Sequence, residues 1–304
     1  MKGKTRIIGT RFSHSKLSRA INLHFMFYFL ANKAIPKILW KRYVRSCSNL
    51  NESIFILSFD CDTELDIEVL PAVIKRLKEI GIQPVLAVPG ELIKKGTDVY
   101  LSLAKTGIEF VNHGYVQHTQ LELPERVYVS SYFYHSLSRA EIRSDIVLGH
   151  KAIQEILGVS PTGFRTPHFG SFQKKSQLDF LRRLLKELGY KYSTSTTPVV
   201  GIKKGPYFKT DVLEFPLTGC PNWPIKVLDS WGFAFAPKRE VTKADYLDQI
   251  SLMCHEIEAG NPLFINIYAD PSQIYDWPEF FDAMLRLAPY NVGRYSEIVD
   301  KVGK

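Results

Sequence analysis

From residue 53 onward, short runs of β-branched and aromatic residues alternate with longer amphipathic segments. The runs predict strands at 53–59, 83–88, 108–112, 162–165, 190–194, 212–215, 263–268 and 291–293. The amphipathic segments predict helices at 67–80, 91–104, 139–157, 172–188, 242–259, 276–287 and 295–302. Such alternation is typical of βα units around a parallel sheet. Seven or eight units over roughly 250 residues fit a closed or nearly closed α/β barrel better than an open sheet.

One segment interrupts this alternation. Residues 196–238 are rich in Pro, Gly and aromatic residues. We expect an irregular insertion there, which holds either a hairpin or a loop that faces the substrate.

The excess positive charge of the chain lies at its N-terminus. The net charge is +8, yet residues 1–50 contain 11 Lys and Arg and no acidic residue, while residues 51–304 contain 28 basic and 31 acidic ones. We therefore expect a basic, apolar and helical extension over 1–50 and the barrel over 51–304. The apolar stretch 21–31 is too short for a membrane span, which needs about 20 residues.

Three roles for the extension stay open. Its helix packs on the body with its charges in water, or residues 1–45 contact an anionic membrane surface. Nucleic-acid binding is the least favoured, since no nucleic-acid motif accompanies the charge. The four cysteines, at 47, 61, 220 and 254, show no paired spacing, which favours reduced thiols. We expect a cytoplasmic protein, peripheral at the inner membrane face if the extension contacts lipid.

Two aspartates follow the first predicted strand. Asp60 and Asp62 are one residue apart, so an extended backbone points both carboxylates the same way. Parallel negative charges at the end of an apolar strand indicate a cation or a reaction that offsets their repulsion. The alternative is that both aspartates cap the next helix.

Other chemically active side chains also lie at or just past predicted strand ends. They are His113, which His118 follows five residues later, Arg165 in Arg165-Thr166-Pro167, and Asp270. The carboxyl ends of barrel strands meet at one face, where barrel enzymes hold their active sites. The sequence therefore predicts one active site built from these groups and the aspartate pair.

The order of these motifs resembles the polysaccharide deacetylase family, carbohydrate esterase family four, over roughly residues 53–300. The resemblance implies a distorted (β/α) barrel and a divalent metal, zinc in the first place, with cobalt or nickel as alternatives. It makes Asp60 the catalytic base and Asp62, His113 and His118 the metal ligands. The family spaces its two histidines four apart, whereas here they are five apart. A loop around Gly114 must therefore bring them together, or His118 is a surface or supporting histidine.

The resemblance also assigns the residues around Arg165. The arginine orients the catalytic aspartate and keeps it ionised, unless it forms only a surface ion pair. The residue after Pro167, here His168, offers its backbone N–H to the oxyanion of the tetrahedral intermediate. We also expect its imidazole to face the substrate, an addition that the family pattern does not supply.

The late strand departs from the family, which places a general-acid histidine there. Here Asn266, Tyr268 and Asp270 share one face of the strand, and Asp270 takes the histidine's position before Pro271. A carboxylic acid with a raised pKa can donate a proton, so Asp270 is the expected acid. The alternatives are that His168 supplies the proton or that acid catalysis is absent.

An aromatic wall for the acyl group or the sugar ring is expected from Trp231 or Trp223. The resemblance thus implies hydrolysis of an N-acetyl or other acyl group on a sugar of an envelope glycan or its lipid-linked precursor. Two alternatives stay open: a catalytically impaired protein that binds glycan, and a hydrolase of a carbon–nitrogen bond in a non-sugar linear amide.

Overall fold

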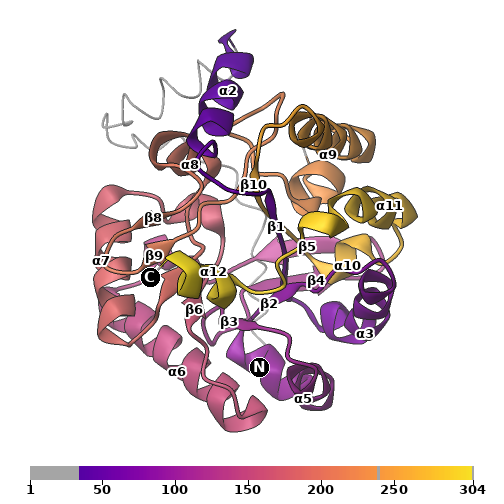
Figure 1. The fold of residues 1–304 in the computed structure, drawn as a ribbon. Helices are drawn as coiled ribbons and strands as arrows, with labels where there is room; N and C mark the ends of the chain where they lie inside the picture. Colours follow the sequence, from indigo (N-terminus) through magenta and orange to yellow (C-terminus); the bar gives the residue numbers. More distant parts are fainter. Residues whose placement is uncertain (1–33, 238–239, 303–304) are drawn as a thin grey trace.

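The computed structural model describes residues 34–237 and 240–302. At its centre a curled sheet of eight strands has the order β10-β1-β2-β3-β6-β7-β9-β8, with helices around its outer face (Figure 1). The strands are β1 (Ile54–Asp60), β2 (Val85–Val88), β3 (Phe110–Asn112), β6 (Gly163–Phe164), β7 (Tyr192–Ser193), β8 (Phe208–Lys209), β9 (Leu213–Glu214) and β10 (Phe264–Ala269). Only the β8–β9 pair is antiparallel; the other pairs of this sheet are parallel. The predicted distorted (β/α) barrel is confirmed.

One predicted strand is absent from this sheet, and one strand of the sheet was not predicted. The run 291–293 forms no strand, only a single bridge between Asn291 and Phe55. The short β8 was not predicted and lies inside the irregular segment 196–238. That segment therefore holds a small hairpin of β8 and β9. Its later part, around Trp231, lines a cavity that Asp60 and Asp62 also line.

The α-helices of the described residues are α2 (Pro36–Ser46), α3 (Glu64–Glu79), α4 (Gly90–Lys95), α5 (Thr97–Lys105), α6 (Arg139–Leu157), α7 (Lys175–Glu187), α8 (Pro198–Lys204), α9 (Lys243–Glu258), α10 (Pro271–Ile274), α11 (Pro278–Leu287) and α12 (Tyr295–Val302). All seven segments predicted from the amphipathic pattern contain helix, whereas the short α8 and α10 were not predicted. Gly96 divides the predicted helix 91–104 into α4 and α5. Helix α3 begins earlier than predicted because Thr63 and Asp66 form a capping box at its first turn.

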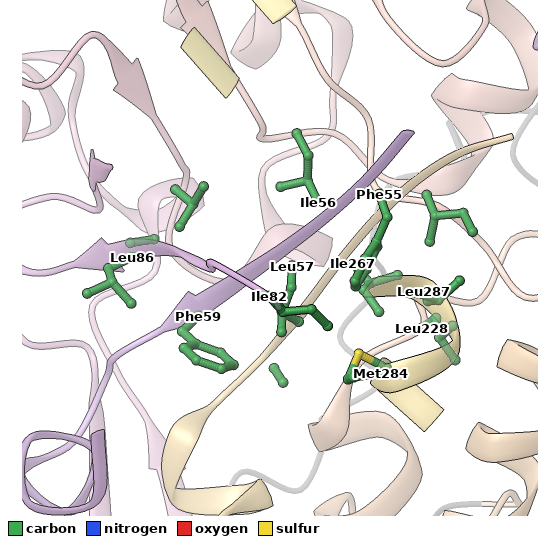
Figure 2. Close-up of a cluster of buried hydrophobic side chains, with 14 of the residues drawn as sticks. Phe55, Ile56, Leu57, Phe59, Ile82, Leu86, Leu228, Ile267, Met284 and Leu287 are labelled. Carbon is green, nitrogen blue, oxygen red and sulfur yellow. The ribbon is translucent and has the colours of Figure 1, made fainter. Parts of the chain in front are cut away.

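The side chains of strand β1 face two environments, the apolar layer beside α11 and the interior of the barrel. Figure 2 shows Phe55, Leu57 and Phe59 packed toward Met284 and Leu287 of α11. Ile56 points to the opposite side of the strand, as the alternation of strand side chains requires. Ser58 and Asp60 have the same parity as Ile56, so β1 places polar groups inside the barrel.

At the edge strand β10, hydrogen bonds to side chains and loop backbone take the place of a further strand. Beside β10, the Thr218 N–H donates to the Asn266 carbonyl at 2.8 Å, and the Asn266 N–H donates to Thr218 Oγ1 at 2.8 Å. The Asn266 amide also donates to the carbonyls of Phe215 and Pro216 at 3.2 and 3.0 Å. Asn266 therefore has a structural role inside the barrel, where β10 meets the residues that follow β9.

Helix α2 packs on the body of the molecule. Leu39, Trp40 and Tyr43 are buried, and the Tyr43 hydroxyl donates to the Phe264 carbonyl at 2.5 Å. The helix expected in the basic segment is thus present over residues 36–46 and packs on the body, with Lys37, Lys41, Arg42 and Arg45 exposed. The apolar stretch 21–31 lies outside the described residues, and the boundary at residue 50 stays a prediction. Within the described ranges, no helix has the length and apolar character needed to cross a bilayer.

Candidate active site

Asp60 and Asp62 lie at one end of the barrel, where β1 leads into α3. The N-cap of α3 is Thr63, whose hydroxyl accepts from the Asp66 N–H. Asp66 in turn accepts from the N–H groups of Asp62 and Thr63 at 3.1 and 2.8 Å. The cap is therefore complete without Asp60 or Asp62, and the capping alternative is wrong for both.

The two histidines converge on Asp62 despite their five-residue spacing. His113 Nε2 lies 3.6 Å from Asp62 Oδ1, and His118 Nε2 lies 3.1 Å from Asp62 Oδ2. One ligand atom from each of the three residues lies within 4.8 Å of the others. The chain turns at Gly114, which has a φ of +81°. A Cβ there would overlap the carboxylate of Asp145, so glycine permits the turn.

The donor set fits a transition metal such as zinc. Among the described residues, Asp62 Oδ1 is buried without a hydrogen-bond partner, and His118 Nε2 lies beside the Asp62 carboxylate without an aligned hydrogen bond to it, as expected for atoms that face a cation. The other ring nitrogens lie near carbonyls: His113 Nδ1 is 2.9 Å from the Arg165 carbonyl, and His118 Nδ1 is 3.3 Å from that of Val116. These contacts orient both Nε2 atoms toward Asp62.

Electrostatics distinguish the two histidines. Burial and the neighbouring His118 lower the pKa of His113 to about 3, so its imidazole is neutral, the form that binds metals. Burial opposes charge on His118 as well, but the Asp62 carboxylate outweighs it and raises the His118 pKa. Burial acts to raise the pKa of Asp62, but the neighbouring His118 and His113 outweigh it and lower that pKa below its usual range.

Arg165 is fully buried behind Asp60, so the surface ion pair is wrong. Its Nη1 donates to Asp60 Oδ1 at 2.5 Å, and its Nη2 donates to Ser58 Oγ at 2.7 Å and to the Tyr295 hydroxyl at 3.2 Å. Asp60 Oδ2 lies 3.8 Å from His113 Nε2, on the side of the candidate metal site. Burial raises the pKa of Asp60 to about 6, although Arg165 acts to lower it.

His168 lines the same cavity as Asp60 and Asp62. Its backbone is left-handed, with a φ of +52°. Its Nε2 lies 2.8 Å from the Ser131 carbonyl, and its ring contacts those of His118 and Phe133 at centroid distances of 5.0 and 4.4 Å. Burial lowers the pKa of His168 to about 4. Its backbone N–H has no acceptor among the described residues and remains available to a ligand.

Asp270 follows β10 and is held by two neighbours. Its N–H donates to Ser230 Oγ at 3.0 Å, and its carboxylate accepts from the Gln273 amide. Ser230 Oγ donates to Gln273 Oε1 at 2.7 Å, which fixes the direction of that amide. Burial and the nearby carboxylates, Asp62 first among them, raise the pKa of Asp270 well above its usual range.

Asp60, Asp62, His168 and Asp270 line one cavity of about 350 Å³. Its lining combines carboxylates with aromatic rings: Asp60, Asp62, Thr119, Tyr128, Ser130, Phe133, His168, Gly170, Ser171, Val227, Asp229, Trp231, Tyr268, Asp270 and Gln273. Trp231 and Tyr268 therefore lie where the sequence predicts, whereas Trp223 does not line the cavity. His113, His118 and Arg165 lie behind this lining.

Asp229 is the main group that the sequence reasoning missed. It is buried, accepts from the Gly232 N–H and forms a parallel bridge with Tyr268. Burial raises its pKa to about 6. The available signal was an acidic residue two positions before Trp231, in an irregular segment expected to hold either a hairpin or a loop that faces the substrate.

The comparison with known families agrees with this geometry. Residues 48–193 match the sequence model of the polysaccharide deacetylases. The chain belongs to the polysaccharide deacetylase family. No curated protein matches it.

Solved structures extend the likeness to most of this polysaccharide deacetylase. A protein from Mycobacterium smegmatis, assigned as a polysaccharide deacetylase, is 16% identical over 83% of this chain and 90% of that one, with a TM-score of 0.61. The Puue allantoinase is 14% identical over 82% and 89%, with a TM-score of 0.55. A pseudoenzyme of carbohydrate esterase family four from Bacillus anthracis is 15% identical over 83% and 66%, with a TM-score of 0.50. At these identities the likeness establishes a shared fold.

Proposed function

We propose that this polysaccharide deacetylase hydrolyses an N-acetyl or other acyl group on a sugar of a glycan or glycan precursor, with a divalent metal. The convergence of Asp62, His113 and His118 at one buried point beside Asp60 carries the proposal. A base next to a metal site is an arrangement that can hydrolyse an amide, because the metal activates water and the base accepts its proton.

Asp62, His113 and His118 would hold the metal, which polarises the acyl carbonyl and lowers the pKa of the attacking water. Zinc suits one carboxylate and two imidazoles, and cobalt or nickel accept the same donors. The hydrogen-bond contacts of both histidines at Nδ1 keep Nε2 directed at this point.

Asp60 acts as the base in this proposal. Arg165 holds one of its carboxylate oxygens, which leaves Oδ2 on the side of the metal site. With a pKa of about 6, Asp60 is mostly ionised at neutral pH and still accepts a proton readily. As water adds to the acyl carbon, its proton passes to Asp60, and the backbone N–H of His168 donates to the oxyanion.

Asp270 supplies the second proton. Burial and the neighbouring carboxylates raise the pKa of Asp270, which favours the protonated form that can donate to the sugar nitrogen as the carbon–nitrogen bond breaks. Acetate and a free amine are then the products. The aromatic rings of Tyr128, Phe133 and Trp231 offer apolar surfaces for a sugar ring above these groups.

The test combines metal analysis with acetate release from N-acetylated oligosaccharides. We expect wild-type protein to bind zinc, cobalt or nickel and to release acetate. Asp60→Asn should keep the metal and lose about 10²–10⁴-fold in kcat, whereas Asp62→Asn should lose both metal and activity. Asp248→Asn, on the exposed side of α9, is the matched control. Wild-type protein that takes up no metal would contradict the proposal.

The same measurements separate the alternatives. Metal uptake and saccharide binding without acetate release would favour a glycan-binding pseudoenzyme. Hydrolysis of small non-sugar amides, with none of any N-acetylated sugar, would favour an activity closer to that of the allantoinase.

A further inference from the structure

A second cavity, of about 360 Å³, lies between α2 and α8 and shares no lining residue with the active-site cavity. Three of its lining side chains are cationic and none is acidic. The lining consists of Arg42, Ser46, Asn49, Leu50, Ile202, Lys203, Lys204, Gly205, Pro206 and Tyr207. We call it the α2–α8 cleft.

The cationic groups of the cleft are held close together. Burial and the nearby charges of Lys204 and Arg42 lower the pKa of Lys203. No ion pair joins Arg42 or Lys204 to an acidic residue in the part of the chain that the structure describes. Like charges repel one another, and a bound anion would offset that repulsion.

The walls of the cleft are fixed by packing. A Cβ at Gly201 of α8 would lie 3.4 Å from the ring of Tyr43, so the two helices are in close contact there. Tyr43 is anchored to β10 through its hydrogen bond to the Phe264 carbonyl. Trp40 donates to Glu256 of α9 at 3.2 Å. The basic groups therefore project from a rigid surface.

The outer face of α2 adds apolar surface beside this charge. Ile35 and Ile38 are 39% and 59% exposed. Ile38 lies four residues before Arg42, on the same side of the helix. Lys37, Lys41 and Arg45 are also exposed on α2. Exposed apolar residues among basic ones are typical of a helix that lies on an anionic bilayer.

We propose that the α2–α8 cleft binds the phosphate headgroup of an anionic lipid and docks the protein on a membrane surface, with Ile35 and Ile38 at the acyl boundary. Charge complementarity selects this occupant. Residues 1–33 contain seven Lys and Arg and no acid, so they add to the attraction and are repelled from the cleft itself. The proposal does not depend on the activity proposed above.

Sedimentation of the full-length chain with lipid vesicles tests this surface. We expect binding to vesicles that contain phosphatidylglycerol and none to pure phosphatidylcholine. Each basic residue near an anionic surface contributes about fivefold to partitioning. The variant Arg42→Gln/Lys203→Gln/Lys204→Gln should therefore bind on the order of 100-fold more weakly. Ile38→Ser should weaken binding without changing its salt dependence.

A second triple variant controls for net charge. Lys151→Gln/Lys175→Gln/Arg183→Gln removes the same charge from exposed positions on α6 and α7 and should bind much as wild type does. Thermal unfolding checks that all variants are folded. Equal binding by the cleft variant would place the contact elsewhere, in residues 1–33 for instance, and overturn the proposal. Binding of inorganic phosphate without vesicle binding would also overturn it, since the cleft would then take a soluble anion.

Discussion

At the scale of single residues, Asp270 has the surroundings of a proton donor. Its carboxyl lies in a largely buried site with Asp62, Asp66, Asp60 and Asp229 nearby, all of which raise its pKa. A protonated acid is needed only when the leaving group is a poor one, such as an amine. The role of Asp270 is therefore measurable through the leaving group.

We expect Asp270→Asn to lose about 10²–10⁴-fold in kcat on an N-acetyl sugar. On an acetyl ester of nitrophenol the loss should be small, because nitrophenolate leaves without a proton. Asp60→Asn should lose activity on both substrates, since each needs an activated water. Rates on the two substrates check this, and equal losses for Asp270→Asn on both would contradict an acid role.

Arg165 has a structural effect that can be separated from catalysis. Its guanidinium is fully buried and pairs with the buried carboxylate of Asp60. Removal of one partner of a buried pair leaves an uncompensated charge, which costs about 3–5 kcal/mol. We expect Arg165→Met to lower the free energy of unfolding by that amount in chemical denaturation.

The exposed pair of Arg143 and Glu187 provides the control for Arg165. Arg143→Met should leave the free energy of unfolding nearly unchanged, because water screens that pair. The double variant Asp60→Asn/Arg165→Met should recover part of the lost stability. A single Arg165→Met protein as stable as wild type would show that Asp60 needs no buried partner.

At the scale of elements, the loop from β3 to the hairpin of β4 (Thr119–Glu122) and β5 (Val127–Ser130) builds the metal site. His113 follows β3 and His118 precedes β4, with the Gly114 turn between them. Neither regular helix nor strand places residues five apart on one side, so this convergence depends on the turn.

The variant Gly114→Ala should therefore weaken metal binding by about 10–100-fold, the range found when groups that orient ligands are changed. Gly158→Ala is the matched control. Gly158 also has a positive φ, of +70°, but its Cβ would meet no atom within 4 Å. Both variants should lose stability from backbone strain, and Gly114→Ala also from the overlap with Asp145, yet only Gly114→Ala should lose metal in titration calorimetry. Equal metal affinity in both variants would mean that the turn does not set the site.

Sequence patterns located the regular elements better than the irregular ones. Buried strands such as β1 and β10 have continuous apolar runs, and each site residue could be placed by its distance from a strand end. The β4–β5 hairpin was missed because its strands are short and largely exposed, so they lack an apolar run. Asp229 was missed because it reaches the site through a tertiary bridge to Tyr268, and its place two residues before Trp231 does not by itself reveal that contact.

At the scale of the whole molecule, the candidate site lies where distant parts of the chain meet. Asp62 follows β1, the histidines flank the turn after β3, and Asp66 accepts from the Ser272 N–H of α10 at 2.7 Å. A metal bound only by the folded arrangement stabilises it against unfolding. Metal removal should therefore affect the global stability of the barrel and not only its activity.

We expect chelation to lower the thermal midpoint by about 5 °C or more. Metal at 100 times its Kd contributes roughly 2.7 kcal/mol, and each kcal/mol shifts the midpoint of a large domain by about 2–4 °C. Added zinc should restore the midpoint of wild type and of Asp248→Asn. In Asp62→Asn, neither chelator nor zinc should change it, because the ligand that contacts both histidines is lost. Scanning calorimetry with and without metal gives these midpoints, and a zinc-dependent rise in Asp62→Asn equal to that of wild type would place the stabilising metal at another site.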